Sequence, residues 1–355
     1  MFYNTYNTNI AESTKRWNQI SEHLDDIDIN YSRFYAVDRR NMSPVKIITV
    51  ATHNDGYYQI LQESAKRNGF ELITLAMGEK WTGFSMKPRL LREYLSTLDP
   101  NEIIIHCDAF DVIVNGSSDE LIERFNRIDK TIVYGTENMN ESSGLDVKLF
   151  AHLGFPSCGE HILNAGTVVA KVESLLDLIN LTCEQEGCES GDDQVKLNNV
   201  CNKERQFFED NVYIDVDSRF IINGGCENTV KYLRHLPCNF DLHYDKKENK
   251  MRTDKGYNPI LIHGNGNVNI DEICSELGYD VSTVIKRKDY TTFLLKQHKT
   301  KIQFLALFLI AVCITFLLMN KKLNNYIKLT FVVVILYLIR VLINPLTWIK
   351  DFSNN

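Results

Sequence analysis

The chain has 355 residues, of which 44% are hydrophobic and 24% are charged, and its formal net charge is −7. The high apolar content excludes a disordered chain, and 18 Gly with 7 Pro are too few for a collagen-like repeat. The acidic balance argues against nucleic acid as a partner, because nucleic-acid-binding proteins present basic surfaces.

An α/β domain is expected after an N-terminal arm over residues 1–44. Runs of β-branched residues predict strands, and apolar residues at helical spacing predict helices. In chain order these are a strand at 45–52, a helix at 56–68, a strand at 70–77, a helix at 87–98, strands at 102–107, 131–135 and 166–170, helices at 172–183 and 192–201, and strands at 212–214 and 259–262. The alternation predicts one domain over residues 45–290 with a mostly parallel central sheet.

Two aspartates, Asp108 and Asp111, directly follow the expected strand at 102–107. Ligands of open α/β sheets bind beyond the carboxyl ends of the strands. Neighbouring carboxylates repel each other unless they share a cation, and their oxygens suit Mg²⁺ or Mn²⁺. His263 ends another expected strand, and its imidazole favours Mn²⁺ over Mg²⁺. A solvated turn would explain the same aspartates, and a hydrogen-bonded turn the histidine, so each signal is weak alone.

Further polar or aromatic residues follow other expected elements. Asp192 and Asp193 stand at a helix start, where carboxylates also simply complement the helix dipole. Asn164 precedes a strand, where its side chain either points into the cleft that holds Asp108 and Asp111 or caps a turn. Trp81 and Lys87 follow the second strand and offer a stacking ring and a cation for phosphate, or else a core residue and a solvated charge.

Eight short motifs occur in a fixed order over about residues 45–267. They are T-V-A-T, G-E-x-W, K-x-R-L-L, C-D-A-F-D-V-I, L-N-A-G, D-D-Q, S-R-F and H-G-N-G. This series resembles the glycosyltransferase domain of procollagen lysyl hydroxylases and, more distantly, other sugar-nucleotide transferases of the GT-A type. An ordered series is more specific than any one motif. The resemblance implies a GT-A-like fold that binds a UDP-sugar with Mn²⁺, or with Mg²⁺ as the second choice.

The resemblance also implies roles for individual residues. Asp108, Asp111 and His263 would hold the metal on the diphosphate. The remaining residues implied are Val50, Thr52, Trp81, Lys87, Gly264 and Asn265 in the nucleotide site, and Asp192, Asp193 and Asn164 as catalytic residues facing sugar and acceptor. The family's acidic run before D-D-Q is reduced here, and the stretch between Trp81 and Lys87 is shortened. No iron dioxygenase domain follows, so we do not expect lysine hydroxylation.

We therefore expect a hexosyltransferase that moves glucose or galactose from UDP-glucose or UDP-galactose to an acceptor hydroxyl. The expected acceptor is hydroxylysine or galactosylhydroxylysine of a collagen-like protein. Two alternatives stay open. One is a metal-dependent phosphodiester hydrolase that uses the same carboxylates and His263, and the other is a non-catalytic, membrane-tethered sugar-binding protein.

Two apolar runs at 302–319 and 329–349 predict a C-terminal hairpin of transmembrane helices, and thus a multi-pass membrane protein. Basic residues on their outer flanks favour a catalytic domain in the cytosol, with the lumen of the endoplasmic reticulum or Golgi as the alternative. None of the 9 cysteines forms a C-x-x-C motif, and Cys183 and Cys188 could pair in an oxidising compartment.

Overall fold

The protein was examined as a computed structural model. It describes residues 44–83, 85–137, 148, 151, 154–188, 191–226, 231, 236–238, 240–266, 268–284, 303, 306–318 and 324–343. The predicted N-terminal arm lies outside these described residues except for its last position, so the domain boundaries stay a prediction.

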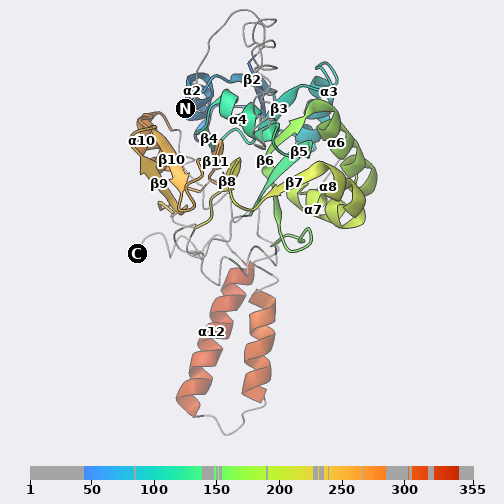
Figure 1. Ribbon diagram of the computed structural model, residues 1–355. Helices are drawn as coiled ribbons and strands as arrows, with labels where there is room; N and C mark the ends of the chain where they lie inside the picture. Colours follow the sequence, from blue (N-terminus) through green and yellow to red (C-terminus); the bar gives the residue numbers. More distant parts are fainter. Residues whose placement is uncertain are drawn as a thin grey trace, which may run out of the picture. The chain divides into compact units, whose positions relative to one another are not determined.

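A six-stranded sheet forms the centre of the domain, in the order β2-β1-β3-β6-β5-β7 (Figure 1). Its strands are β1 (Lys46–Val50), β2 (Glu71–Leu75), β3 (Ile103–Cys107), β5 (Ile132–Thr136), β6 (Leu163–Lys171) and β7 (Val212–Asp215). β6 runs antiparallel to both of its neighbours, β3 and β5, whereas the β1–β2, β1–β3 and β5–β7 pairs are parallel. The prediction of a mostly parallel sheet is corrected to a mixed sheet. A run of β-branched residues predicts a buried strand but does not indicate whether that strand runs parallel or antiparallel to its neighbours. The direction of β6 therefore could not be predicted from its residues.

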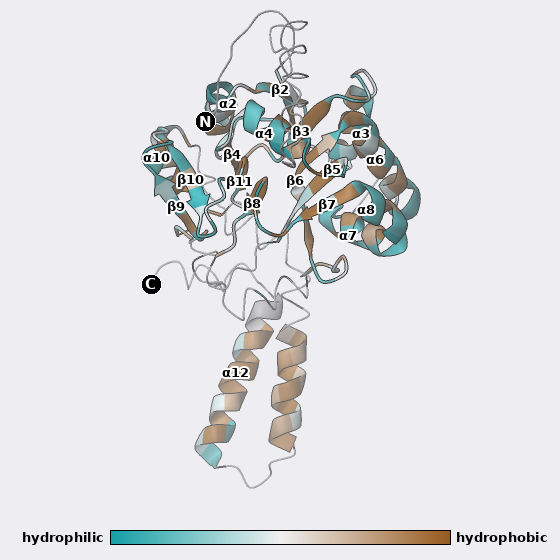
Figure 2. Ribbon diagram, in the orientation of Figure 1, coloured by the Kyte–Doolittle hydropathy of each residue, from teal (hydrophilic) through white to brown (hydrophobic). Residues whose placement is uncertain are grey.

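Helices cover both faces of this sheet. One face carries α3 (Met86–Leu95), α6 (Val172–Glu186), α7 (Asp193–Lys203) and α8 (Arg205–Asn211), and the other carries α2 (Tyr58–Arg67) and α4 (Ser118–Phe125). Successive side chains of β3 alternate between the two cores, because Ile104 packs with the first group and Ile105 with the second. The strands are accordingly hydrophobic along their length in Figure 2, while the helices show a hydrophilic outer side.

A second, three-stranded sheet packs beside the first and has the order β4-β11-β8. Its strands are β4 (Val112–Val114), β8 (Ile221–Asn223) and β11 (Leu261–His263). β11 pairs antiparallel with β4 and parallel with β8, which places His263 opposite Val112 on one side and Asn223 on the other. The acidic segment between β3 and β4 therefore lies where the two sheets meet, next to the end of β11.

Each strand and helix predicted between residues 45 and 262 is present, with boundaries that differ by a few residues. The predicted strands are β1, β2, β3, β5, β6, β7 and β11, and the predicted helices are α2, α3, α6 and α7. The elements that the sequence analysis missed are short. They are β4, β8, α4, α8, the hairpin of β9 (Leu242–Asp245) and β10 (Lys250–Thr253), α10 (Asp271–Glu276) and η2 (Val281–Thr283).

Two helices follow the domain, one over residues 306–318 and the other α12 (Asn325–Ile343). Within the described residues, no helix has the length and apolar character needed to cross a membrane. The predictions of a transmembrane hairpin and of a multi-pass membrane protein are therefore wrong, and the cytosolic placement that rested on them falls too. At 1.5 Å per residue, the described part of the first helix covers about 20 Å and the uncharged part of α12 between Lys328 and Arg340 about 17 Å, against about 30 Å of hydrocarbon.

Six of the 9 cysteines form disulfides. Cys158–Cys201 joins the segment before β6 to α7, Cys183–Cys188 spans the end of α6, and Cys226–Cys238 lies after β8. The three free cysteines are Cys107, Cys274 and Cys313, of which the first two are buried. The pairing of Cys183 with Cys188, which the sequence left open, is thus present.

Candidate functional site

Asp108, Asp111 and His263 converge at the junction of the two sheets. Each contributes one ligand atom, and these atoms lie within 4.8 Å of one another. Asp111 and His263 are buried, and Nε2 of His263 lies 3.5 Å from Oδ1 of Asp111. The structure therefore brings together the three residues that were predicted to hold a metal ion.

The imidazole of His263 is held on one side and has no hydrogen bond on the other. Its Nδ1 lies 2.8 Å from Oδ1 of Asn223, whereas the buried Nε2 has no hydrogen-bond partner among the described residues. Burial acts to lower the pKa of His263, but the negative charges of Asp111, Asp108 and Glu137 outweigh it, and the pKa is raised. A buried ring nitrogen that faces two carboxylates and makes no hydrogen bond among the described residues is the arrangement that a divalent cation would complete.

The reversed direction of β6 brings the start of that strand to this cluster. The backbone N–H of Asp108 donates to the carbonyl of Gly166 at 2.7 Å. A Cβ on Gly166 would lie 2.5 Å from Cε1 of His263 and 2.8 Å from Oδ2 of Asp108. Only glycine therefore leaves room for both side chains. Oδ1 of Asn164, two residues earlier, accepts from the Gly166 N–H at 2.8 Å.

Glu137, which follows β5, connects several of the predicted residues. Its carboxylate accepts from Nδ2 of Asn164 at 3.0 Å and from Nε2 of Gln194 at 2.5 Å, and also from Nδ2 of Asn265. Burial raises the pKa of Glu137, and the three amide donors oppose that rise. Glu137 and Gln194 were not among the predicted site residues. Glu137 shows a signal close to that of Asp108, since it is a carboxylate that follows an expected strand by two residues.

Lys87 lies between two carboxylates that belong to different elements. Its ammonium group donates to Oδ1 of Asp108 at 2.5 Å and to Oδ2 of Asp193 at 3.2 Å. Burial acts to lower the pKa of Lys87, but the charges of Asp108 and Asp193 raise it well above its usual value. Lys87 is therefore a fixed cation that links α3, the end of β3 and the start of α7.

The two neighbouring aspartates at the start of α7 have different contacts. Asp192 is the helix N-cap, and its Oδ1 accepts from the N–H groups of Gln194 at 3.0 Å and Val195 at 3.1 Å. Asp193 uses Oδ1 for the Gln194 N–H and Oδ2 for Lys87. Asp193 is thus connected through Lys87 to the cluster of Asp108, Asp111 and His263, whereas Asp192 has the contacts of a helix cap.

Val50 and Thr52, both predicted to contact the nucleotide, lie at the end of β1. Val50 is buried as the last residue of the strand. The hydroxyl of Thr52 lies 2.9 Å from Nδ1 of His53, whose ring stacks on Phe110 at a centroid distance of 4.8 Å. Phe110 lies between Asp108 and Asp111 in the sequence, so the stacked rings connect this acidic segment with the end of β1. The sequence analysis did not identify His53 or Phe110.

The other predicted nucleotide residues, Gly264 and Trp81, lie on different elements. The N–H of Gly264 donates to the carbonyl of Asp111 at 2.7 Å, which holds the turn after β11 against the acidic segment. Trp81 lies in the segment before α3, and 40% of its surface is exposed.

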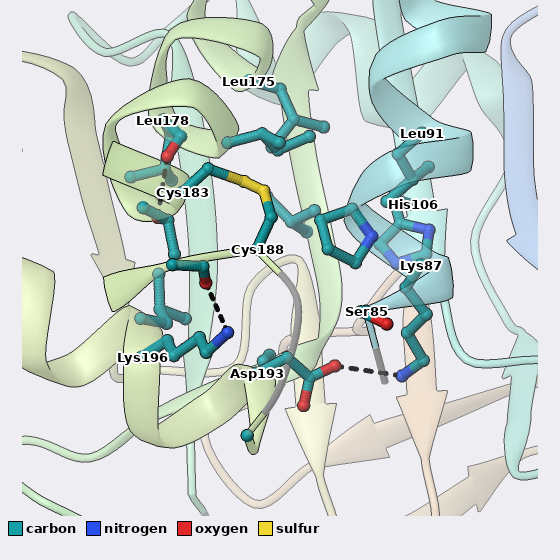
Figure 3. A pocket seen from close by; sticks show the side chains of 18 of the residues that line it. Ser85, Lys87, Leu91, His106, Leu175, Leu178, Cys183, Cys188, Asp193 and Lys196 are labelled. Atoms are coloured by element: carbon teal, nitrogen blue, oxygen red, sulfur yellow. Dashed lines mark hydrogen bonds and ion pairs between the residues drawn. A yellow bond between two sulfur atoms is a disulfide. The ribbon is translucent and has the colours of Figure 1, made fainter. Parts of the chain in front are cut away.

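A cavity of about 100 Å³ borders Lys87 and Asp193 (Figure 3). Its walls are mainly apolar side chains of α3, α6, α7 and the adjoining strands, such as Leu91, Val168, Leu175, Leu178, Ile179 and Leu197. The Cys183–Cys188 disulfide forms part of the wall opposite Lys87. Lys87, at the charged end of this cavity, also contacts Asp108.

Comparison with known proteins gives a match to a family model described as the PLOD GT domain, over residues 41–279. The chain belongs to this family. The resemblance stated from the short motifs is thereby confirmed, and the chain carries a glycosyltransferase domain.

Several curated relatives are similar to the chain. They include procollagen-lysine,2-oxoglutarate 5-dioxygenase of Drosophila melanogaster, 28% identical over 244 residues, which are 64% of this chain and 31% of the relative. The multifunctional procollagen lysine hydroxylase and glycosyltransferase of Caenorhabditis elegans is 24% identical over 236 residues, 62% of this chain and 30% of the relative. The chain thus spans about a third of the length of the curated relatives it matches.

Two solved glycosyltransferase structures also resemble the chain. One is a glycosyltransferase involved in glycosylation of the major capsid of PBCV-1, with a TM-score of 0.33 and 11% identity over 49% of this chain and 84% of that one. The other is GlyE of Streptococcus pneumoniae TIGR4, with a TM-score of 0.34 and 12% identity over 68% of this chain and 63% of that one.

Proposed function

We propose that this protein transfers glucose or galactose from a UDP-sugar to a hydroxyl group of a protein acceptor. The observation that carries the proposal is the convergence of Asp108, Asp111 and Nε2 of His263 at the junction of the two sheets. Family membership supports the class of reaction. The site supports a donor with a diphosphate, since such donors are bound through a divalent cation.

The proposed ion is Mn²⁺, held by the two carboxylates and by Nε2 of His263. A set of oxygen ligands with one imidazole fits that ion, with Mg²⁺ as the second choice. When bound, the ion neutralises the negative charge that develops on the departing diphosphate. Lys87 is proposed to supply a second positive charge for a phosphate oxygen, which its position beside Asp108 supports.

The remaining residues divide between the nucleoside and the sugar. The aromatic surface of His53 and Phe110, together with Val50, Thr52 and Trp81, is proposed to bind the uridine, since flat rings stack on aromatic side chains.

The sugar hydroxyls are proposed to bind the amide and carboxylate groups of Asn164, Asn265 and Glu137. These groups are already oriented by their mutual hydrogen bonds, so little ordering is needed when the sugar binds.

Asp193 is proposed to accept the proton of the attacking hydroxyl or to orient it. Its carboxylate is oriented by hydrogen bonds from the Gln194 N–H and from the ammonium group of Lys87. The cavity beside Asp193 would take an apolar part of the acceptor. The names of the curated relatives, which refer to procollagen lysine, support hydroxylysine or galactosylhydroxylysine of a collagen-like protein as the acceptor.

The test is a donor panel on the full chain with Mn²⁺, with free UDP and the mass of the acceptor peptide as readouts. UDP-glucose and UDP-galactose are each supplied with and without hydroxylysine and galactosylhydroxylysine peptides. We expect UDP release that depends on the acceptor, together with a hexose added to the peptide. Replacement of Asp111 by Asn should lower turnover at least about 100-fold, because a metal ligand is lost.

The matched control is Asp177→Asn, which changes an exposed carboxylate on α6 and should leave turnover unchanged. Cleavage of UDP-sugars at the same rate without any acceptor would favour the phosphodiester hydrolase instead. Binding of UDP without turnover of any donor, and without loss of binding in Asp111→Asn, would favour the non-catalytic alternative.

A further inference from the structure

Asn223 is a buried residue beside the metal cluster, with 1% of its surface exposed. It ends β8 and lies opposite His263 in the parallel pairing of β8 with β11. Its side chain has three contacts: Nδ2 donates to the carbonyl of Thr136 at 2.9 Å, and Oδ1 lies 2.8 Å from Nδ1 of His263 and accepts from the hydroxyl of Thr167 at 3.4 Å.

These contacts fix which way the amide of Asn223 points. The backbone carbonyl of Thr136 can only accept a hydrogen bond, so the amide nitrogen has to face it. The amide oxygen then faces Nδ1 of His263. Since that oxygen can only accept, Nδ1 of His263 carries the hydrogen and donates it. In a neutral imidazole one nitrogen carries the hydrogen, so Nε2 keeps its lone pair on the side of the carboxylates.

The surroundings oppose the reverse orientation of the amide. A flipped amide would place Oδ1 against the carbonyl of Thr136, and two acceptors would then face each other in a buried site. There is also little free space, because a Cβ on Gly135 would lie 2.6 Å from Nδ2 of Asn223. Groups from β5, β6 and β11 thus hold the Asn223 side chain in one state.

We propose that Asn223 is a positioning residue that keeps His263 in the tautomer with the hydrogen on Nδ1, so that Nε2 can bind the metal ion. The inference rests on the proposed metal site. Residues that hydrogen-bond the second nitrogen of a histidine ligand fix its ring and tautomer, and their loss weakens metal binding by about 10–100-fold.

The first test measures the dissociation constant for Mn²⁺ on the full chain, from the electron paramagnetic resonance signal of the free ion. Asn223→Ala should raise this constant by about 10–100-fold. Asn223→Asp keeps an acceptor for Nδ1 but sets its second oxygen against the Thr136 carbonyl, so it should recover part of the affinity that Asn223→Ala loses. The matched control is Asn115→Ala, which removes another buried amide whose Nδ2 donates to two backbone carbonyls, those of Met251 and Pro259, and should leave the Mn²⁺ constant unchanged.

The second test reads the tautomer directly in metal-free protein. Ring ¹⁵N chemical shifts at alkaline pH, with the His263 signals assigned by their loss in His263→Gln, should show the hydrogen on Nδ1 in the original chain. In Asn223→Ala the ring should populate both tautomers.

Two results would overturn the inference: a ring protonated on Nε2 in the original chain, or an unchanged Mn²⁺ constant in folded Asn223→Ala. If the original chain binds no Mn²⁺ at all, the proposed metal site fails instead. The ring shifts then still decide the tautomer.

Discussion

At the scale of single residues, the absence of a side chain at Gly166 leaves the space that His263 and Asp108 occupy. We expect Gly166→Ala to weaken Mn²⁺ binding by at least about tenfold, because the added methyl group would have to displace the side chain of His263 or of Asp108. Calorimetric titration with Mn²⁺ measures the change.

The control for this prediction lies on the same strand. Ala170→Gly also changes β6 by one buried methyl group, but at its other end, so it should lower thermal stability and leave Mn²⁺ binding intact. Equal losses of Mn²⁺ affinity in both variants would show that β6 stability, and not the space around His263, controls the site.

The residues of the site differ in how far the sequence could reveal them. Asp108 and His263 stand directly at the ends of apolar runs, where ligand groups gather in α/β sheets, and the structure brings them together. Glu137 follows an equally clear strand but lacks a second acidic neighbour, which is why it was missed. Asn223 ends a strand of only three residues, too short to be recognised by its pattern.

At the scale of elements, the same physical limit applies to the sheet. Runs such as those of β1 and β3 predict buried strands because their apolar residues are consecutive and β-branched. Strand direction and order come from contacts made far along the chain. β6 shows this, since its residues predict a strand while its antiparallel position between β3 and β5 had to come from the structure. α4 was detectable through its capping box of Ser117 and Glu120.

Two of the disulfides should contribute unequally to stability. Cys158–Cys201 closes a loop with a sequence separation of 43 residues, and Cys183–Cys188 one with a separation of 5. On the loop-entropy account, replacing the first pair by serine should lower the free energy of unfolding by about 4 kcal/mol, and replacing the second by about 2 kcal/mol. Urea unfolding of the two double variants, followed by circular dichroism, measures both.

The reverse order would contradict the loop-entropy account. It would mean that Cys183–Cys188 stabilises mainly through native contacts, as part of the cavity wall beside Asp193.

At the scale of the whole molecule, the last part of the domain is fastened to its first helix. The guanidinium group of Arg67 lies over the ring of Tyr279, 4.0 Å from its centroid, and donates to the carbonyl of Leu277 at 2.8 Å. The hydroxyl of Tyr57 donates to Asp271 at 2.8 Å, next to the start of α10. These contacts join segments more than 200 residues apart in the chain.

This junction should make the protein sensitive to base. Burial raises the pKa of Tyr279 to about 12, from an ordinary value of 10.0. Between these values the folded state keeps a proton that the unfolded state loses, so stability falls as the pH rises through that window. The Tyr279→Phe variant has no phenol proton at this position. Between pH 9 and pH 11 its free energy of unfolding should therefore fall by about 1 kcal/mol less than that of the original chain.

Urea unfolding at the two pH values checks this difference. Tyr326→Phe is the control, because Tyr326 is 80% exposed and its replacement should leave the pH dependence unchanged. A Tyr279→Phe variant that loses as much stability as the original chain would assign the base sensitivity to other groups.

The position of β11 near the end of the domain has a consequence for the order in which the chain is made. Asp108 and Asp111 leave the ribosome about 150 residues before His263 does, and β11 can pair with β4 and β8 only after that. A growing chain therefore has both carboxylates but lacks the imidazole of His263 for much of its synthesis. The proposed Mn²⁺ ion would then bind tightly only after β11 has paired with β4 and β8. Its binding would follow the folding of the domain and would not initiate it.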